Sequence, residues 1–328
     1  RGMPFPGRLA MYSRFVFASP HLPPFPRRMR TASASSAAMG RVRDAANEYR
    51  YSAPEPGLTG CAGEQWKRAP EDKRALRQKG AIMADDNAAK TQQEERDQLI
   101  SQLIEVNAGR AAYYRMLGEL FFRELTQEQV EHLAGMDFAG MDGDDDLIAQ
   151  GYDDMRRYLR HVNSGTRQAL ACDYAHTFLA AGNYETFAAT PFESVFTSQL
   201  GLMMQEARDD VYKMYCEQGI QPQADLHVPE DHVSFEFEFL ATVIERTNAA
   251  LLTGEFARVR ALAETVSEFH RLHQLNWIDD LCDAVLDVAE TRFYRGVAKV
   301  TRGFVHMETE VVADELEVLQ GLADKQAA

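Results

Sequence analysis

Residues 229–240 read Pro-Glu-Asp-His-Val-Ser-Phe-Glu-Phe-Glu-Phe-Leu, and this stretch decides between a strand and a helix. The alternation of phenylalanine and glutamate has the period of two that is typical of a strand. Helical spacing accounts for more of the surrounding apolar residues, because they recur at intervals of three and four. The two helical stripes are Val233, Phe237, Leu240 and Ile244, and Phe235, Phe239 and Val243. We therefore predict a buried helix with two acids at its margin.

Helical patterns also fill the rest of the chain from Asp97 onward. Thr126 and Gln129 have the spacing of a capping box, which predicts a helix that begins near Gln127. A further helix is expected after the acidic run 142–146, because acids favour the positive end of a helix dipole. The remaining predicted helices span residues 166–179, 193–218, 230–247, 255–273, 277–303 and 308–322. No long stretch alternates like a strand, so residues 83–328 are predicted to form a single compact all-α domain.

Residues 1–82 differ from the rest in composition. They hold 15 basic and 6 acidic residues, whereas the remainder holds 20 basic and 44 acidic residues. Several prolines and a Ser/Ala run at residues 31–38 show no sustained period, which predicts a disordered N-terminal arm. The alternatives are a transit-like arm and an extension from a reading frame assigned too early, with Met83 as the start. On this interpretation, deleting residues 1–82 leaves thermal melting and peptide binding unchanged.

The net charge of −15 argues against nucleic acid and anionic lipid as partners. No window approaches the roughly 18 apolar residues that a membrane span requires, so membrane insertion is not expected. The four cysteines lack a CxxC spacing, which fits neither a zinc cage nor a disulfide framework. No cofactor is expected, because GxSxG, Walker and glycine-rich dinucleotide motifs are absent from the sequence.

Two stretches of the sequence have spacings similar to those of metal sites. The acidic run 142–146 is similar to a calcium loop, but Leu147 stands where that loop requires glycine. His232 and Glu236 are four residues apart, a spacing that places two ligands on one helix face. No HExxH motif accompanies them, so neither a metal site nor catalytic residues are predicted. A metal-dependent hydrolase using His232, Glu236 and Asp231 is kept as the less favoured alternative.

Several segments together resemble the TorD/DmsD family of redox-enzyme maturation chaperones. They are Tyr113–Leu117 with Leu120 and Phe121, Asp173–Leu179, Pro191–Phe196, and Pro229–His232 followed by Glu236–Leu240. The segment Pro191–Phe196 is similar to the family's PYESV turn, with Phe192 where the family often has tyrosine. The last segment is similar to its PxDH and ELEFL signature. The resemblance covers roughly residues 98–305.

The resemblance implies a single all-α fold and a cytoplasmic chaperone, not an enzyme. Its partners would be the twin-arginine leader peptide and the apo form of a molybdenum-cofactor oxidoreductase, held for cofactor insertion before export. The twin-arginine export machinery is a further implied partner, and the family allows both monomers and homodimers. A second interpretation is a helical assembly adapter for a nitrate-reductase-like catalytic subunit, without a twin-arginine preference.

A receptor for such a leader needs carboxylates beside an apolar groove, because the leader offers two arginines followed by an apolar stretch. The two signature segments supply both kinds of residue. His232 invites a pH-dependent role, with capping or packing of its helix as the alternative. The candidate peptide-binding residues are Pro191, Phe192, Glu193, Ser194, Phe196, Pro229, Asp231, His232 and Glu236.

Overall fold

The computed structural model describes residues 28–31, 73–136, 138, 146–181 and 188–327. The chain divides into two units, Arg1–Thr31 with Asp97–Ala328, and Ala32–Arg96. In the second unit the described residues are helical and belong to α2. The acidic run weighed as a calcium loop lies outside the described residues up to Asp145.

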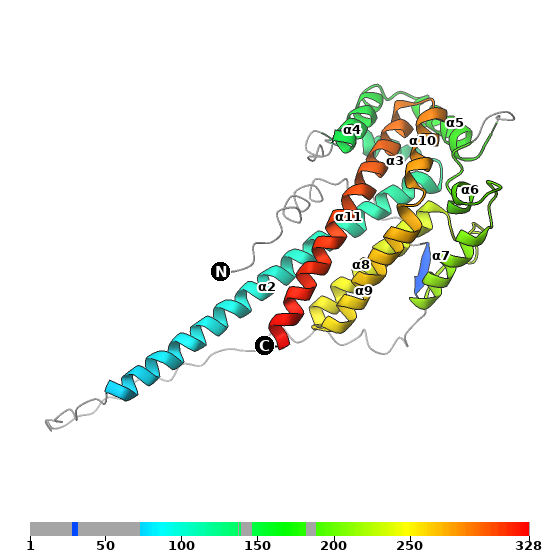
Figure 1. Cartoon of the computed structure of the whole chain (residues 1–328). Helices are drawn as coiled ribbons and strands as arrows, with labels where there is room; N and C mark the ends of the chain where they lie inside the picture. Colours follow the sequence, from blue (N-terminus) through cyan, green and yellow to red (C-terminus); the bar gives the residue numbers. More distant parts are fainter. Residues whose placement is uncertain (1–27, 32–72, 137, 139–145, 182–187, 328) are drawn as a thin grey trace, which may run out of the picture. The chain divides into compact units, whose positions relative to one another are not determined.

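The prediction of an all-α fold is confirmed (Figure 1). The helices are α2 (Lys73–Phe122), α3 (Gln127–Ala134), α4 (Asp146–Leu159), α5 (Thr166–Phe178), α6 (Glu193–Thr197), α7 (Glu206–Glu217), α8 (Val233–Thr253), α9 (Phe256–Phe269), the π-helical turn η1 (His270–Gln274), α10 (Ile278–Val288) and α11 (Arg292–Ala327). Two short strands, β1 (Met29–Thr31) and β2 (Ile220–Pro222), pair antiparallel. No helix in the described part of the chain is long and apolar enough to cross a membrane.

Helix α8 is the buried helix predicted from residues 229–240. Phe235, Phe237 and Phe239 are all fully buried, so the period-two run is a helix with apolar neighbours on every side. The ring of Phe237 contacts Tyr114 at 5.6 Å and Phe121 at 6.5 Å between centroids. These contacts join α8 to the second half of α2. The helix ends at Gly254, whose left-handed φ of 71° suits glycine.

Helix α11 packs against α4, α9 and α10 (Figure 1). The crossing with α4 depends on two glycines: a Cβ on Gly151 would lie 2.7 Å from the carbonyl oxygen of Gly296, and one on Gly296 would lie 2.5 Å from that of Gly151. Arg110 of α2 makes a buried bidentate pair with Glu308 of α11 and also contacts Glu315. The guanidinium and both carboxylates are nearly inaccessible, and Asn107 completes the cluster.

Two predicted helices are each interrupted. The helix expected over residues 193–218 is split into α6 and α7, because Gly201 and Met204 adopt left-handed φ angles of 61° and 62° that a helix cannot continue. The helix expected over residues 277–303 breaks at Ala289, and α11 then continues through the segment predicted as a separate last helix. The buried carboxylate of Asp173 caps this new start by accepting hydrogen bonds from the amides of Glu290 and Thr291, both at 2.9 Å.

Other boundaries agree with the sequence. Thr126 and Gln129 form the predicted capping box at the start of α3, with both reciprocal bonds present. Residues 28–31 differ from the predicted disordered arm, because β1 pairs with β2 in the register Met29↔Pro222 and Thr31↔Ile220. Arg28 and Met29 are buried. Composition did not indicate this contact, because a strand of three residues gives no detectable period.

Candidate functional site

The two signature segments lie against each other. Phe192 and His232 form an isolated antiparallel bridge. The amide of Glu193 donates to the carbonyl of Asp231 at 3.0 Å, and the amide of Val233 donates to that of Pro191 at 3.0 Å. The structure therefore brings together segments that are separated by more than thirty residues in the sequence, as the family resemblance implies. We call this arrangement the signature crossing, residues 191–196 with 229–236.

Asp231 has a structural position in the crossing. Its Oδ2 accepts from the amide of Ser194 at 2.9 Å, which satisfies a backbone donor at the start of α6. The residue is fully buried, and burial raises the pKa of its carboxyl group. Ser194 is buried as well, and its hydroxyl accepts from the amide of Gln205 at 3.2 Å. These two side chains hold backbone in place and offer little surface to a ligand.

His232 caps α8. Its Nδ1 accepts from the amide of Ser234 at 3.1 Å, so the ring is neutral with its proton on Nε2. The ring lies edge-on to Phe192, with 4.9 Å between centroids, and also contacts Phe122. Burial lowers the pKa of His232 to about 3. The structure thus favours the capping role over a histidine that titrates near neutrality.

Glu236 is fully buried, and neither of its carboxyl oxygens makes a hydrogen bond with a described residue. Burial raises the pKa of Glu236 well above its ordinary value, and the nearby Glu193 and Asp231 raise it further. Both effects favour the protonated form of this carboxyl group. Within the described ranges, no group of three or more His, Cys, Asp or Glu side chains could hold a metal ion.

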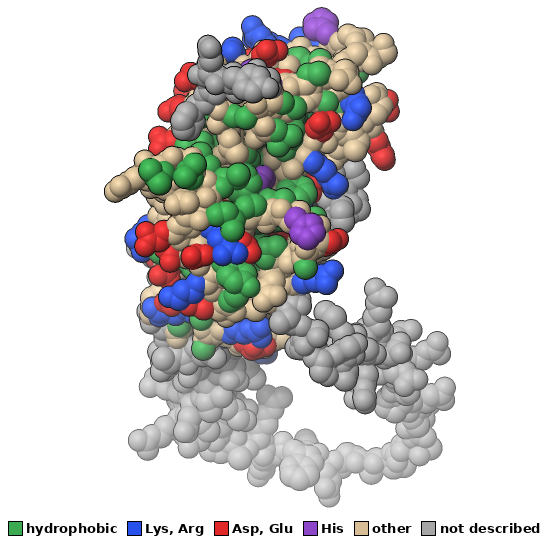
Figure 2. All heavy atoms as spheres, turned by 90° about the vertical axis from the view of Figure 1, so that its right-hand side faces the viewer, with side chains coloured by type: hydrophobic (Ala, Val, Ile, Leu, Met, Phe, Trp, Pro, Cys, Tyr) green, Lys and Arg blue, Asp and Glu red, His purple; other side chains and the backbone are tan. Residues whose placement is uncertain are grey.

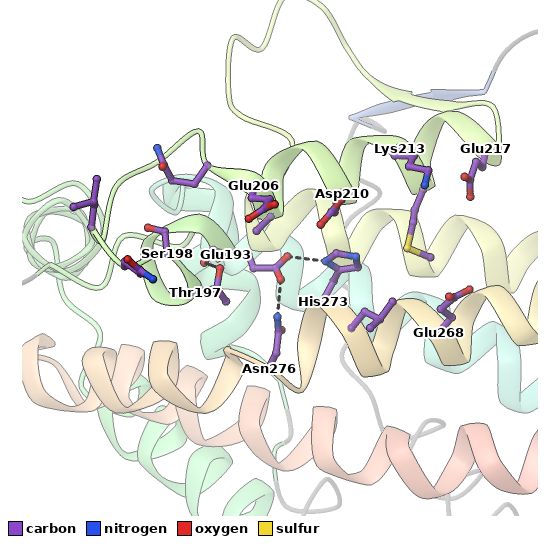
Figure 3. Close-up of a pocket in the computed structure, with 16 residues that line it drawn as sticks. Glu193, Thr197, Ser198, Glu206, Asp210, Lys213, Glu217, Glu268, His273 and Asn276 are labelled. Carbon is purple, nitrogen blue, oxygen red and sulfur yellow. Dashed lines mark hydrogen bonds and ion pairs between the residues drawn. The ribbon is translucent and has the colours of Figure 1, made fainter.

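Glu193 connects the crossing to a cavity of about 840 Å³. Its Oε2 contacts Nδ1 of His273 at 3.0 Å, and its Oε1 accepts from Nδ2 of Asn276 at 2.8 Å (Figure 3). Burial raises the pKa of Glu193, while the hydrogen bond from His273 opposes that shift. Among the residues predicted from sequence, Glu193 is the one that lines this cavity.

Four further residues predicted from the sequence support the crossing, namely Pro191, Phe192, Phe196 and Pro229. Phe196 is half-buried, and its ring packs at a tilt against Trp277, with 5.6 Å between centroids. The indole Nε1 of Trp277 donates to the carbonyl of His273 at 2.5 Å, which fixes the turn beside the cavity. Pro191 is buried, whereas Phe192 and Pro229 are half-buried.

The walls of the cavity carry exposed acids that were not predicted as site residues. Glu206, Asp210 and Glu217 lie along α7 and Glu268 lies on α9, all lining the same cavity (Figure 3). All four are exposed, and none makes an ion pair with another described residue. Lys213 is the one lysine among the lining residues. The cavity is therefore strongly acidic.

The loop between α6 and α7 places apolar side chains beside these acids. Leu200 lines the cavity and is 74% exposed, and Leu272 of η1 lines it and is 37% exposed. The next residues in the loop, Leu202, Met203 and Met204, are also exposed. Figure 2 shows hydrophobic side chains gathered on the face that carries α6 and α7, with charged groups among them. The signal in the sequence was the run Leu200-Gly-Leu-Met-Met204, in which four of the five residues are apolar.

A second cavity, of about 690 Å³, has the opposite charge. Arg157, Arg160, His161 and Arg292 are among its lining residues, and no acidic side chain lines it. It is unsuited to a cationic peptide. Of the two cavities, only the one between α7 and α9 combines acids with exposed apolar side chains.

Comparisons with known proteins agree with the motifs. Residues 142–283 match a protein-family model described as "Nitrate reductase delta subunit". The chain is 25% identical over 215 residues to the chaperone protein TorD of Vibrio atlanticus, covering 64% of this chain and 97% of that protein. It is 23% identical over 221 residues to the TorD of Aliivibrio fischeri, covering 66% of this chain and 100% of that protein. The motifs, the family model and these relatives all point to a similarity with the TorD/DmsD family of redox-enzyme maturation chaperones.

Proposed function

We propose that this protein is a cytoplasmic chaperone that binds the twin-arginine leader peptide of a molybdenum-cofactor oxidoreductase. It holds the apo enzyme until the cofactor is inserted, before export. In this proposal the leader lies in the acidic cavity between α7 and α9, with its apolar stretch on the loop 198–205. The signature crossing positions these two parts and makes little direct contact with the peptide.

One observation carries the proposal: acids that make no ion pair with another described residue lie beside exposed apolar side chains. Glu206, Asp210, Glu217 and Glu268 leave the cavity without a matching set of cations. Guanidinium groups pair well with carboxylates, because their planar N–H donors match the carboxylate oxygens. Exposed apolar side chains that lie next to one another, as Leu200, Leu202, Met203 and Met204 do, are typical of a surface that another chain covers.

The magnitudes divide the binding energy between the two parts. Exposed ion pairs contribute roughly 0.2 to 1 kcal/mol each, whereas micromolar affinity needs about 8 kcal/mol. Apolar burial contributes about 25 cal/mol per Å², so several hundred Å² of the leader must be covered after ordering costs. The arginines therefore set selectivity and the apolar stretch sets most of the affinity.

The test is a calorimetric titration of the full chain with leaders of redox enzymes encoded near its gene. The leaders are compared with copies in which both arginines are lysine and with a leader that lacks its apolar stretch. We expect micromolar binding that weakens with lysine and is lost without the apolar stretch. The variant Leu200→Ser should weaken binding about tenfold, since a buried leucine contributes roughly 1.5 to 3 kcal/mol.

The matched control is Leu252→Ser, because Leu252 is 73% exposed and lies at the other end of α8 from the crossing. It should bind the leader as the wild type does. Equal losses in the Leu200 and Leu252 variants would remove the loop from the proposal. No binding to any leader would contradict the proposed function.

A second candidate is favoured by the description of the family model, which names a nitrate reductase subunit. In that case the protein is an assembly adapter for a nitrate-reductase-like catalytic subunit and has no twin-arginine preference. The same titration separates the two candidates. Equal affinity for arginine and lysine leaders, together with capture of such a subunit on immobilised protein, would favour the adapter.

A further inference from the structure

A second place in the molecule receives an arginine, and the chain's own residues 28–31 fill it. Strand β1 adds to the edge of β2, and the amide of Gln223 donates to the carbonyl of Arg28 at 2.7 Å. The pairing is made by backbone groups, so it does not depend on which side chains the added strand carries. β2 therefore offers an edge to an extended segment.

The side chain of Arg28 enters the helical domain beside this edge. Arg28 is 5% exposed and forms an ion pair with Glu119 of α2. Its guanidinium lies over the ring of Phe122, at 4.0 Å from the centroid, where the ring's electrons attract a cation. The domain thus supplies a carboxylate and an aromatic face to one guanidinium. We call this place the arginine seat, Glu119, Phe122 and Glu238.

Glu238 of α8 holds the backbone of the same segment. Its Oε1 accepts from the amide of Arg28 at 2.8 Å and from the amide of Met29 at 3.3 Å. Glu119 and Glu238 are 4% and 6% exposed. Without Arg28, Glu238 would lose this cation and Glu119 would keep only the longer ion pair with Arg123 at 3.9 Å. Burial of acids without a partner is costly, which makes an empty seat unfavourable.

The next arginine of the strand has no such contacts. Arg30 is exposed, and it pairs through its backbone with Gln221. Arg28 is buried whereas Arg30 is exposed, so the seat holds only one of these two arginine side chains. Arg30 therefore provides a matched control on the same segment.

We propose that the arginine seat is a peptide-binding site, selective for an arginine in an extended segment, and that residues 28–31 occupy it as an intramolecular competitor. The occupant is the segment Arg28–Thr31 of this chain, and a peptide of the same sequence supplied in trans competes with it. This proposal is independent of leader binding at the acidic cavity, because it concerns other residues and another peptide. A tethered segment competes at an effective concentration of roughly a millimolar, so the wild type shields the seat from micromolar peptide.

The experiment uses the full chain and a synthetic peptide with the sequence of residues 25–34. Binding is measured by calorimetry for the wild type, for Arg28→Ala and for Arg30→Ala. We expect Arg28→Ala to bind the peptide at least tenfold more tightly than the wild type or Arg30→Ala. Adding Glu238→Gln to Arg28→Ala should reduce that binding, since one backbone acceptor is weakened.

A peptide in which the residue corresponding to Arg28 is lysine tests the selectivity. It should bind Arg28→Ala at least tenfold more weakly, because an ammonium group lacks the planar fork of donors. If Arg28→Ala loses helical circular dichroism, the titration is repeated with Arg28→Lys, which keeps a cation in the chain. Equal binding by the wild type and the variant that is used would overturn the proposal, as would equal binding of the arginine and lysine peptides.

Discussion

The signature crossing and the acidic cavity both hold carboxylates, but those of the crossing are buried whereas the acids along α7 are exposed. At the crossing, Asp231 and Glu236 are fully buried, and burial raises the pKa of both. Around the cavity, Glu206 and Asp210 are exposed and make no ion pair with another described residue. Glu193 belongs to both regions, since it lines the cavity from the crossing side.

The difference separates residues that build the fold from residues able to take a ligand. The crossing residues are held by backbone hydrogen bonds and by each other, so they position α6 and α8. The exposed acids of the cavity make no ion pair with another described residue and have solvent access, which a peptide needs. A recognisable motif can therefore lie one layer behind the surface that is proposed to bind.

The largest expected effect is on the free energy of unfolding, and it contrasts a buried apolar residue of the crossing with an exposed one of the loop. Phe235→Ala should lower the free energy of unfolding by about 3 to 5 kcal/mol, because Phe235 is fully buried at the start of α8. Leu200→Ala should change it by no more than about 0.5 kcal/mol, because that side chain is exposed. Urea denaturation measures both values. Similar losses in the two variants would erase the distinction between the crossing and the loop.

Asp231→Ala should cost about 1 to 3 kcal/mol, because it leaves the buried amide of Ser194 without its acceptor. Asp231→Asn keeps an acceptor oxygen and should recover most of the loss. Thermal melting and denaturant titration of both variants check this. A ligand role alone would instead leave stability unchanged in both variants while changing peptide binding.

Because of His232, the folded protein is expected to lose stability in acid. Its pKa in the folded protein is lowered to about 3 by burial, so the unfolded chain binds its proton first and stability falls as the pH drops below about 6.5. Relative to His232→Asn, which keeps a capping acceptor, the wild type should lose up to about 2 kcal/mol between pH 7 and pH 5. A constant difference across that range would show that His232 titrates normally.

Glu236 is expected to change stability with pH in the opposite direction. Its pKa is raised by burial, so the folded protein holds the proton longer than the unfolded chain and stability falls as the pH rises above about 4.5. Glu236→Gln cannot ionise, and its advantage over the wild type should grow from pH 5 to pH 8. Melting temperatures of the two proteins at several pH values measure the trend, which a flat or declining advantage would refute.

The fold was predictable where apolar spacing was strong. Val233, Phe237, Leu240 and Ile244 fall on one stripe of α8, and all four are buried as that stripe requires. The breaks were not predictable, because the left-handed turn at Met204 and the capping of α11 by Asp173 depend on backbone geometry and tertiary contacts. Periodicity reports which face is buried, but it does not report where a helix is interrupted.

The site was predictable only to the level of its scaffold. The meeting of residues 191–196 with 229–236 followed from the family resemblance, but the burial of Asp231 and Glu236 did not follow from the sequence. The acids of α7 were not among the predicted site residues. The arm prediction also requires revision, because Arg28 and Met29 are buried against α2 and α8. Deleting residues 1–82 is now expected to lower the melting temperature.

The most direct test of the central claim is to map where the leader lies. A twin-arginine leader with a photoreactive residue beside its arginines is irradiated with the full chain, and the crosslinked residues are identified by mass spectrometry. We predict crosslinks to the loop 198–205 and to α7, and fewer of them in a Glu206→Gln, Asp210→Asn, Glu268→Gln variant but not in Glu317→Gln, an exposed acid on α11. Crosslinks confined to α8 and β2, or crosslinks that are undiminished in the triple variant, would contradict the account.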